Sequence, residues 1–311
     1  MKFKSILFSG ALALLCPAFA TAQSNVSIGV RGGLTIPGLT GGAGDPVSEG
    51  YSTATRMGAG VFAEIKISDV FSIQPMLEYT QEGAKRSGMQ ALVATASNAQ
   101  LAGAFPAAWQ GALSSEPQLA VLTPMLPANF PAPPQYLYAD AKRDAKMDYL
   151  MLPVLAKFGW NLGESSPWRV YVSAGPYVAL LLNAKNEVSM GGSSVYADNL
   201  KSPLIQLPNE VMSAIPEATG AVAQISDGLA ANLASGFDGT EDIKDQLHPF
   251  NWGLEGNIGL QYQINRNKIF IEAGGNYGLM NIQKSTGNGL YLNGKNHIGA
   301  ATVMIGYAYE L

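Results

Sequence analysis

Two histidines are the first candidates for chemistry in this 311-residue sequence, because imidazole titrates near neutral pH. His248 closely follows Asp242 and Asp245, and a carboxylate beside a histidine can make it a general base that activates water or a serine. His297 lies in a different segment, and no spacing motif joins either histidine to a nucleophile. A hydrolase that uses His248 therefore stays an alternative, and two ordinary surface histidines are the other.

The sequence contains no other pattern that is typical of an active site. It lacks GxSxG, a GxGxxG loop and any His, Asp or Glu set with the spacing of metal ligands. The glycine-rich stretch at 38–46 has the composition of a flexible loop. We therefore expect a protein that is not an enzyme and that needs neither a cofactor nor a metal ion.

Residues 1–22 have the pattern of a secretory signal peptide, with two lysines, an apolar core and a small-residue ending. Cleavage before Gln23 would remove Cys16, the single cysteine of the chain, and leave residues 23–311 as the mature domain. That domain would hold no disulfide and no thiolate metal ligand.

Composition and hydropathy limit the remaining classes. The formal net charge of −4 argues against nucleic acid as a partner. No stretch after the signal peptide has the roughly 18 uninterrupted apolar residues that a membrane helix needs. Any membrane span of the mature chain must therefore be built from strands.

Eight segments alternate apolar and polar residues, which is typical of β-strands because successive side chains point to opposite faces. Near residue 252, for example, Trp252 and Leu254 alternate with Asn251 and Glu255. Each segment is about as long as a tilted membrane strand. The predicted strands cover residues 25–35, 57–67, 71–82, 147–158, 168–182, 249–263, 268–281 and 297–310.

The polar faces of these strands carry eight charged residues, four acidic and four basic. In a soluble sheet the charges would be solvated, whereas in a transmembrane barrel they would line the lumen while the apolar face contacts lipid. Buried charge is costly unless it is paired, so equal numbers of both signs permit an ion-paired lumen. The predicted lumen network contains Arg31, Glu64, Lys66, Glu78, Lys157, Arg169, Glu255 and Glu272.

The lengths of the connections favour the barrel. Short connections alternate with long ones along the whole chain, which is typical of an up-and-down outer-membrane barrel with periplasmic turns, extracellular loops and both termini in the periplasm. A Greek-key sandwich has no reason to show this alternation. The sequence thus predicts an all-β fold, an eight-stranded antiparallel up-and-down transmembrane β-barrel with two long, partly helical extracellular insertions at about 83–146 and 183–248.

Several runs of the sequence carry a resemblance to a known family: IGVRGGLT, GAGVFAEIKISDVFSIQPMLEYTQEGAK, DYLMLPVLAKF, VYVSAGPYVALLL and EAGGNYGLMNI. They resemble the outer-membrane β-barrel family abundant in Bacteroidota, the porin-like group that includes the PorT-type proteins. The resemblance covers the strands and neither long insertion, and Met151 stands where that family often has a polar residue. It implies an outer-membrane location and a barrel fold, and it raises a secretion-complex component resembling PorT as an alternative function.

The expected lumen is too narrow for a large pore. An eight-stranded barrel leaves an interior that side chains can just fill, and Met76, Tyr149, Tyr171 and Tyr177 are bulky inward residues. We therefore expect a structural or partner-binding surface component of the cell envelope, in contact with outer-membrane lipid.

The two insertions are the expected sites of any further contact. The first has an Ala- and Gln-rich part followed by a Pro-rich part, and the second repeats apolar residues at helical spacing, interrupted by Pro216 and Gly220. The insertions could pack on each other as a cap, or their apolar faces could bind another envelope protein. The candidate partner-binding residues are Val211, Ile215, Val222, Ile225 and Leu229.

Overall fold

The fold is all-β and antiparallel, as predicted. The computed structural model describes residues 25–41, 46–93, 110, 114, 136–204, 213, 216–284 and 295–311. Its long strands are β1 (Val26–Gly41), β2 (Arg56–Lys66), β3 (Phe71–Val93), β4 (Tyr136–Asn161), β5 (Trp168–Ser189), β8 (Phe250–Ile264), β9 (Asn267–Gly278) and β10 (Asn296–Glu310).

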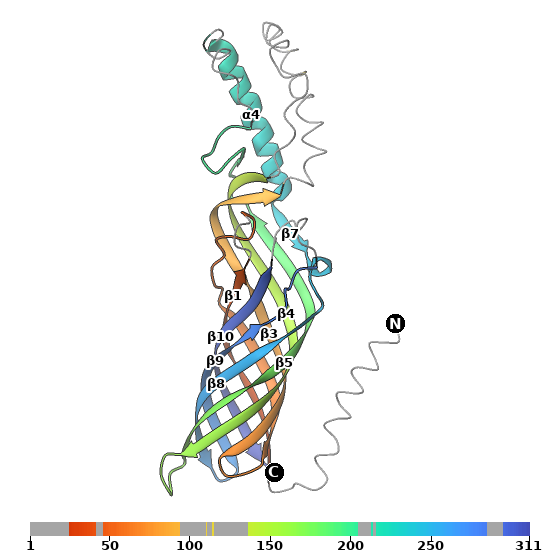
Figure 1. Ribbon diagram of the computed structural model, residues 1–311. Helices are drawn as coiled ribbons and strands as arrows, with labels where there is room; N and C mark the ends of the chain where they lie inside the picture. Colours follow the sequence, from red (N-terminus) through yellow and green to blue (C-terminus); the bar gives the residue numbers. More distant parts are fainter. Residues whose placement is uncertain are drawn as a thin grey trace.

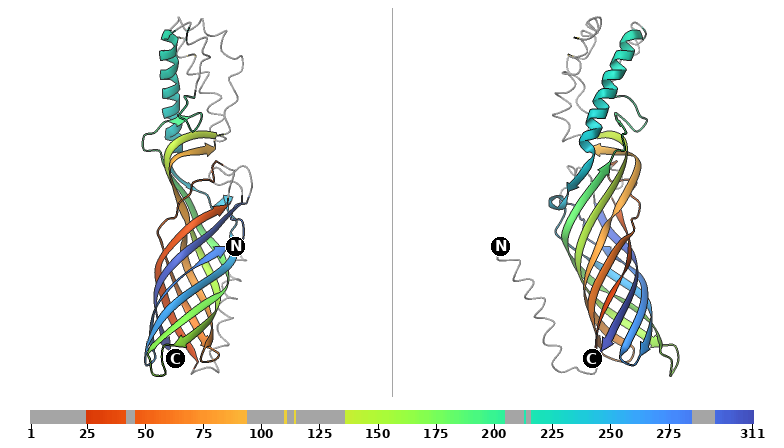
Figure 2. Two further views of the ribbon diagram at one scale, coloured as in Figure 1. Left: turned by 60° about the vertical axis from the view of Figure 1, so that its left-hand side comes forward. Right: turned by 180° about the vertical axis from the view of Figure 1, so that it is seen from behind.

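The long strands pair in a closed ring. β1 pairs with both β2 and β10, and the remaining long strands each have a long strand on either side, since β4 pairs with β5 and β5 with β8. Within the described part of the chain the ring contains eight strands, which wind around a common axis (Figures 1 and 2). Closure leaves no free strand edge within the ring, which removes the usual weakness of a sheet.

The two ends of the ring differ. The short connections at 67–70, 162–167 and 265–266 lie at the same end as Leu311, at the bottom of Figure 1, which we call the lower end. At the opposite, upper end, strands β3, β4 and β5 extend beyond the ring, and helix α4 (Pro216–Phe237) projects furthest (Figures 1 and 2).

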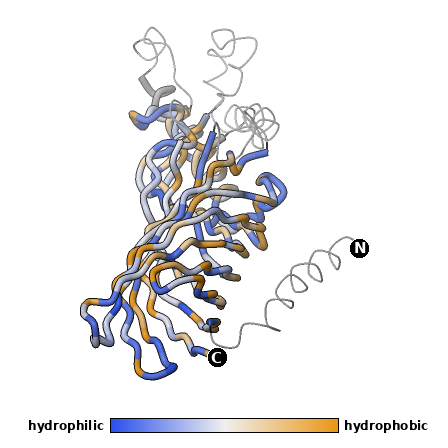
Figure 3. Tube along the Cα trace, turned by 60° about the horizontal axis from the view of Figure 1, so that its bottom comes forward, coloured by the Kyte–Doolittle hydropathy of each residue, from blue (hydrophilic) through white to orange (hydrophobic). Residues whose placement is uncertain are grey.

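The outward positions of the strands in the ring are mostly apolar, in agreement with the predicted register. Val172 is 41% exposed, whereas its neighbour Ser173 is 5% exposed and faces the lumen. The same alternation appears in β8, where Leu254 is exposed and Glu255 is buried. Figure 3 shows hydrophobic and hydrophilic residues alternating along the strands. Among the described residues no helix is long and apolar enough to span a membrane.

The first insertion is not helical at its two ends. β3 and β4 stay paired without interruption from Ala84↔Ala145 to Val93↔Tyr136, so residues 83–93 and 136–146 form strand, and most of 94–135 lies outside the described residues. The predicted strand ends at residues 82 and 147 were wrong because the apolar residues change from the outward to the inward face above them. Along residues 136–146 of β4 the inward side chains are mostly apolar and the outward side chains mostly polar or charged, which hides a strand from a search for apolar outer faces.

The second insertion begins as strand and continues into one helix. β5 reaches Ser189 and is followed by β6 (Val195–Tyr196), α4, β7 (Gly239–Asp242) and the short helix η4 (Lys244–Gln246). α4 starts at Pro216, where the missing N–H of proline is harmless, and it continues through Gly220, so the predicted break at Gly220 was wrong. Both insertions therefore begin as strand, the first also ends as strand, and the second carries the helix α4. The helical part predicted for the first insertion lies mostly outside the described residues.

Candidate functional site

The lumen is filled from the lower end upward by layers of different chemistry. The inward residues of β3 show the order in one strand: Ser72 and Gln74, then Met76, then Glu78 and Thr80, then Glu82. Polar, apolar and charged layers follow one another in the same sense on neighbouring strands because the strands are paired in register.

The lowest layer is a polar cavity of about 90 Å³. Lys157 lies beside it and pairs with Glu64 at 3.0 Å, while Lys268 pairs with Glu310 at 3.3 Å and donates a hydrogen bond to Ser27 at 2.8 Å. The cavity is lined by Ser27, Glu64, Lys66, Ser72, Arg169, Gln261, Gln263, Lys268 and Glu310.

An aromatic layer closes this cavity from above. Phe62, Tyr171 and Phe270 are buried, and the ring of Phe270 makes edge contacts with Phe62 at 5.7 Å and with Tyr171 at 6.5 Å between centroids. Met76 and Leu155 belong to the same cluster. The ammonium of Lys157 lies 4.1 Å from the centre of the Tyr171 ring, which is a cation–π contact.

The next layer is a charge cluster around Arg31. The guanidinium of Arg31 donates to Glu272 at 2.6 Å, to Glu255 at 2.8 Å and to Glu78 at 2.9 Å. The hydroxyl of Tyr171 donates to the second oxygen of Glu272 at 2.9 Å. Since all four charged groups are buried, these bonds replace the water that the charges lose, and one arginine links four different strands.

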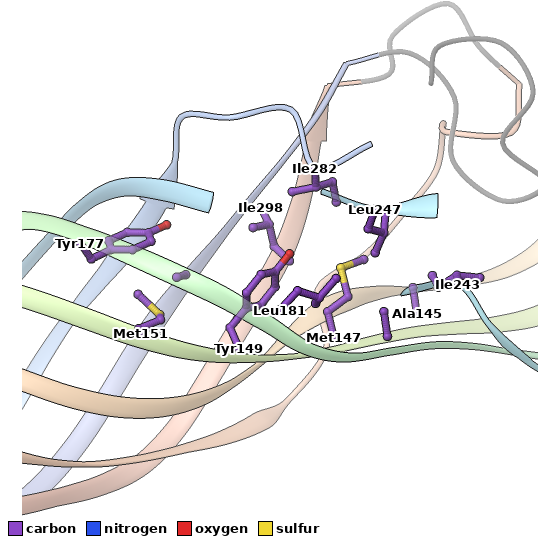
Figure 4. Packing of buried hydrophobic residues seen from close by; sticks show 12 residues of the cluster. Ala145, Met147, Tyr149, Met151, Tyr177, Leu181, Ile243, Leu247, Ile282 and Ile298 are labelled. Atoms are coloured by element: carbon purple, nitrogen blue, oxygen red, sulfur yellow. The ribbon is translucent and has the colours of Figure 1, made fainter. Parts of the chain in front are cut away.

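An apolar cluster covers the charge layer at the upper mouth. Tyr149, Met147, Tyr177 and Leu181 from β4 and β5 belong to this cluster, together with Ile243 and residues from other elements (Figure 4). Its further members include Ala145, Met151, Ala179, Ala184, Leu247, Ile282 and Ile298. The inward residues Met76, Tyr149, Tyr171 and Tyr177, which the sequence identified, are all buried in these layers.

The structure divides the predicted charge network into three parts. Arg31, Glu78, Glu255 and Glu272 form the cluster described above, and Glu64 pairs with Lys157 at 3.0 Å. Lys66 and Arg169 join neither group and contact Asp69 in a lower turn instead, at 2.9 Å to its carboxylate and 2.7 Å to its backbone oxygen respectively.

The sequence interpretation missed Glu82, which is buried in the lumen. Glu82 closed the predicted third strand, and its spacing of four residues from Glu78 already places both on one face. Following the alternation to the end of the predicted strand would have found it.

The upper extension carries ion pairs on its outer face. Lys146 contacts Glu187 at 2.6 Å and Asp144 at 3.8 Å, and Arg56 reaches the same Asp144. On the inner face, burial and the charge of Arg143 lower the pKa of the Arg86 guanidinium, which donates to the backbone oxygens of residues 46 and 47 at 3.1 Å. Charged residues thus replace apolar ones on the outside of the extension.

Helix α4 packs on this extension through its C-terminal half. Leu229, Ala230, Leu233 and Ala234 are buried against Leu92, Leu137, Ala139, Ala141, Val188, Met190 and Val195. Of the candidate partner-binding residues, Leu229 therefore contacts its own chain. Val222 and Ile225 lie in α4 with side chains outside the description, and Val211 and Ile215 lie outside the described residues.

The contacts of the two histidines involve backbone atoms and one aromatic ring. The Nδ1 atom of His297 lies 3.2 Å from the backbone oxygen of Gly278, and its ring stacks on Tyr277. The carboxylate of Asp242 accepts the backbone N–H of Lys244, and the backbone N–H of His248 donates to Ile282. The described residues contain no cluster of His, Cys, Asp and Glu that could hold a metal ion.

Comparison with known proteins identifies a family model. The model described as outer membrane protein beta-barrel domain matches residues 21–284. No curated protein matches the sequence.

Several solved structures match the chain at low sequence identity. Neisserial surface protein A is 11% identical, with 91% of this chain and 97% of that chain covered and a TM-score of 0.35. Ail of Yersinia pestis is 11% identical, with 92% and 99% covered and a TM-score of 0.33. OprG of Pseudomonas aeruginosa is 11% identical, with 93% and 97% covered and a TM-score of 0.33.

Proposed function

Because the chain belongs to the family of outer membrane protein beta-barrel domains, we propose that it is a closed, non-enzymatic barrel that presents an extracellular binding platform. Its location is the outer membrane. The proposal has three parts, which concern the lipid-facing belt, the filled lumen and the extension above the belt.

The apolar outer face is the proposed lipid contact. It ends at the same level on neighbouring strands, where Tyr79 donates to Asp148 at 2.8 Å and Asn183 donates to the same carboxylate at 3.1 Å. Below this level the outward residues of β4 and β5 include Leu152 and Leu180, and above it they include Lys146 and Lys185. We assign the lower end and both termini to the periplasm, because short turns lie on that side in such barrels.

The filled lumen supports a barrel without a large pore. The aromatic layer, the Arg31 cluster and the apolar cluster occupy successive levels, and their members are buried. Purified protein in planar lipid bilayers should therefore give no stable, large conductance steps. Such steps from pure protein would contradict this part of the proposal.

The observation that carries the binding role is the ordered extension at the upper end. Above the end of the apolar outer face β3 and β4 remain paired as far as Val93↔Tyr136, and α4 is anchored there by an apolar cluster that barrel closure does not require. Loops on a rigid scaffold are the usual place of binding residues. We infer that the extension and α4 bind another surface or envelope protein.

Two deletions that respect the strand register test this role. Val188 lies opposite Gly239, so an Asn-Gly turn can replace residues 189–238 and remove α4. Lys85 lies opposite Asp144, so a second Asn-Gly turn can replace residues 86–143. Both variants should insert into membranes and show the altered gel mobility of folded barrels when unheated.

Copurification from native outer membranes, followed by mass spectrometry, gives the readout. The full chain should retain a partner that the variant without residues 189–238 loses, and the variant without residues 86–143 should lose it too. If both shortened barrels keep the same partner, the contact lies on the lipid face or the periplasmic turns. A partner set made of secretion proteins would favour the alternative of a PorT-like role.

A further inference from the structure

Glu82 is a buried carboxyl group without a cation. It is 3% exposed and lies on the inner face of β3, opposite Met147 of the apolar cluster. Its Oε1 atom accepts from Asn276 of β9 at 3.2 Å and from Thr80 at 3.5 Å, both neutral donors. Its Oε2 atom is buried and has no hydrogen-bond partner among the described residues.

The guanidinium of Arg31, the nearest positive charge of this cluster, already binds other carboxylates. Arg31 donates to Glu78, Glu255 and Glu272, so the charge cluster already contains three carboxylates for one guanidinium. Glu82 interacts electrostatically with Glu78 and Glu255 and would add a fourth negative charge. Lys157 is bound to Glu64 and lies at the aromatic layer below. An ionised Glu82 would therefore be a buried charge that no cation pairs with, which is strongly unfavourable.

We propose that Glu82 is a proton-binding site, a carboxylic acid that stays protonated at neutral pH with its proton on Oε2. The proton comes from water, and no other bond changes. The hydroxyl of Tyr149 is also buried without a hydrogen-bond partner among the described residues, and it interacts electrostatically with Glu82.

Besides Arg31, the inner faces of β3 and β4 carry Arg86 and Arg143, four residues further up than Glu82 and its opposite residue Met147, and Arg86 binds the backbone oxygens of residues 46 and 47. The charged and titratable side chains that face this level of the lumen are Arg31 from β1, Glu78 from β3, Tyr149 from β4, Tyr177 from β5, Glu255 from β8 and Glu272 from β9. Five of these six are acids or phenols. Proton binding by Glu82 therefore limits the negative charge directly beneath the apolar cluster. This role of Glu82 is independent of the proposed partner binding.

The proposal fixes the sign of a pH effect. In an unfolded chain a glutamate titrates at about pH 4.3 and is ionised at neutral pH. Unfolding at neutral pH therefore releases the Glu82 proton. The folded state then loses stability as the pH rises from that value, until Glu82 ionises in the folded state as well. The unfolding equilibrium constant should change by up to about tenfold per pH unit in this window.

Infrared spectroscopy of the folded barrel in detergent micelles tests the proton directly. Wild-type protein at pH 7 should show the C=O stretching band of a protonated carboxylic acid, and Glu82→Gln should lack it. The matched control is Glu64→Gln, which removes a buried carboxylate that is paired with Lys157 and should leave the band unchanged. Absence of the band from wild type, or its persistence in Glu82→Gln, would overturn the proposal.

Unfolding by denaturant in lipid vesicles gives a second readout. Between pH 6 and pH 9 the unfolding equilibrium constant of wild type should increase more than that of Glu82→Gln, whereas equal slopes would contradict the proposal. If Glu82→Gln does not fold, the wild-type band alone decides: it should disappear when the pH is raised and return when the pH is lowered. If the band does not change with pH, the proposal that Glu82 binds this proton is wrong.

Discussion

Tyr171 of β5 lies directly opposite Gly259 of β8, and its ring occupies the space where a side chain at residue 259 would begin. The same relationship recurs inside the ring, where Phe62 covers Gly29 and Phe270 covers Gly306. A large ring and an absent side chain thus share one cross-strand position. This pairing lets an eight-stranded lumen hold three aromatic rings at one level.

Gly259→Ala should therefore destabilise the barrel, because the new methyl group would displace the Tyr171 ring. The expected loss is about 1–3 kcal/mol in the free energy of unfolding, which is typical of overpacking. Denaturant unfolding in lipid vesicles measures it. The matched control is Gly256→Ala on the same strand, where the nearest atoms are 3.7 and 4.0 Å from the added carbon and little change is expected. Equal effects at both glycines would contradict the argument.

Val172 and Ser173 test which face contacts lipid. Val172→Arg should cost about 2–4 kcal/mol near the middle of the bilayer, because the charge would face hydrocarbon. Ser173→Arg acts on the lumen packing instead, since Ser173 is buried there. Single cysteines at the two positions give the direct measurement: a label at 172 should report lipid. If the label at 172 reports water and the label at 173 reports lipid, the register is shifted by one residue.

Arg31 should be the most sensitive charged residue of the lumen. Arg31→Met leaves Glu78, Glu255 and Glu272 without their shared donor, and loss of one partner from a buried ion pair costs about 3–5 kcal/mol. Because protonation neutralises carboxylates, the variant should regain stability as the pH falls, and unfolding measured at several pH values checks this. Lys66→Met is the control, since its pair with Asp69 is exposed and solvent screens it, so its loss should change stability little.

Leu233 should hold α4 against the extension. Leu233→Asp puts a charge into the apolar cluster, so the helix should detach and lose roughly the 1.5–3 kcal/mol that burial of a leucine contributes. Hydrogen exchange should accelerate about tenfold or more in residues 216–237 and remain unchanged in the ring, because each 1.4 kcal/mol corresponds to a factor of ten. Ala231→Asp, on the exposed side of the same helix, should have little effect. Acceleration throughout the ring would mean that α4 supports the barrel itself.

The lipid-facing part of the fold could be predicted because two constraints act on it together. Outward residues such as Val172 must be apolar, and the alternation with Ser173 then defines both the strand and its register. The short turn around Asp69 marked where one strand returns into the next. Each of these signals is local in the sequence.

The extension could not be predicted in the same way, because its physical environment differs. Outside the belt an outward residue has no reason to be apolar, and Lys142, Asp144 and Lys146 of β4 suggest a charged loop when they are considered alone. Only their pairing with β3 and β5 shows that they belong to a sheet. For the lumen, the sequence placed charges on the correct face but could not assign partners, since Arg31 reaches Glu272 across 241 residues of chain.

Ring closure protects the barrel from strand exchange, but the extension reopens the sheet and creates new edges. On the side of β3 that faces β2 the last described backbone pairing is the bridge between Ser52 and Lys85, so the upper residues of β3 have no strand partner on that side in the described chain. An exposed edge invites pairing with a neighbouring molecule, especially in a crowded membrane surface. Gly88 interrupts this edge with a φ of +101°, which a regular strand partner cannot follow. A residue that restores regular β geometry at position 88 should therefore promote self-association of a protein whose barrel alone has no means of aggregating edge to edge.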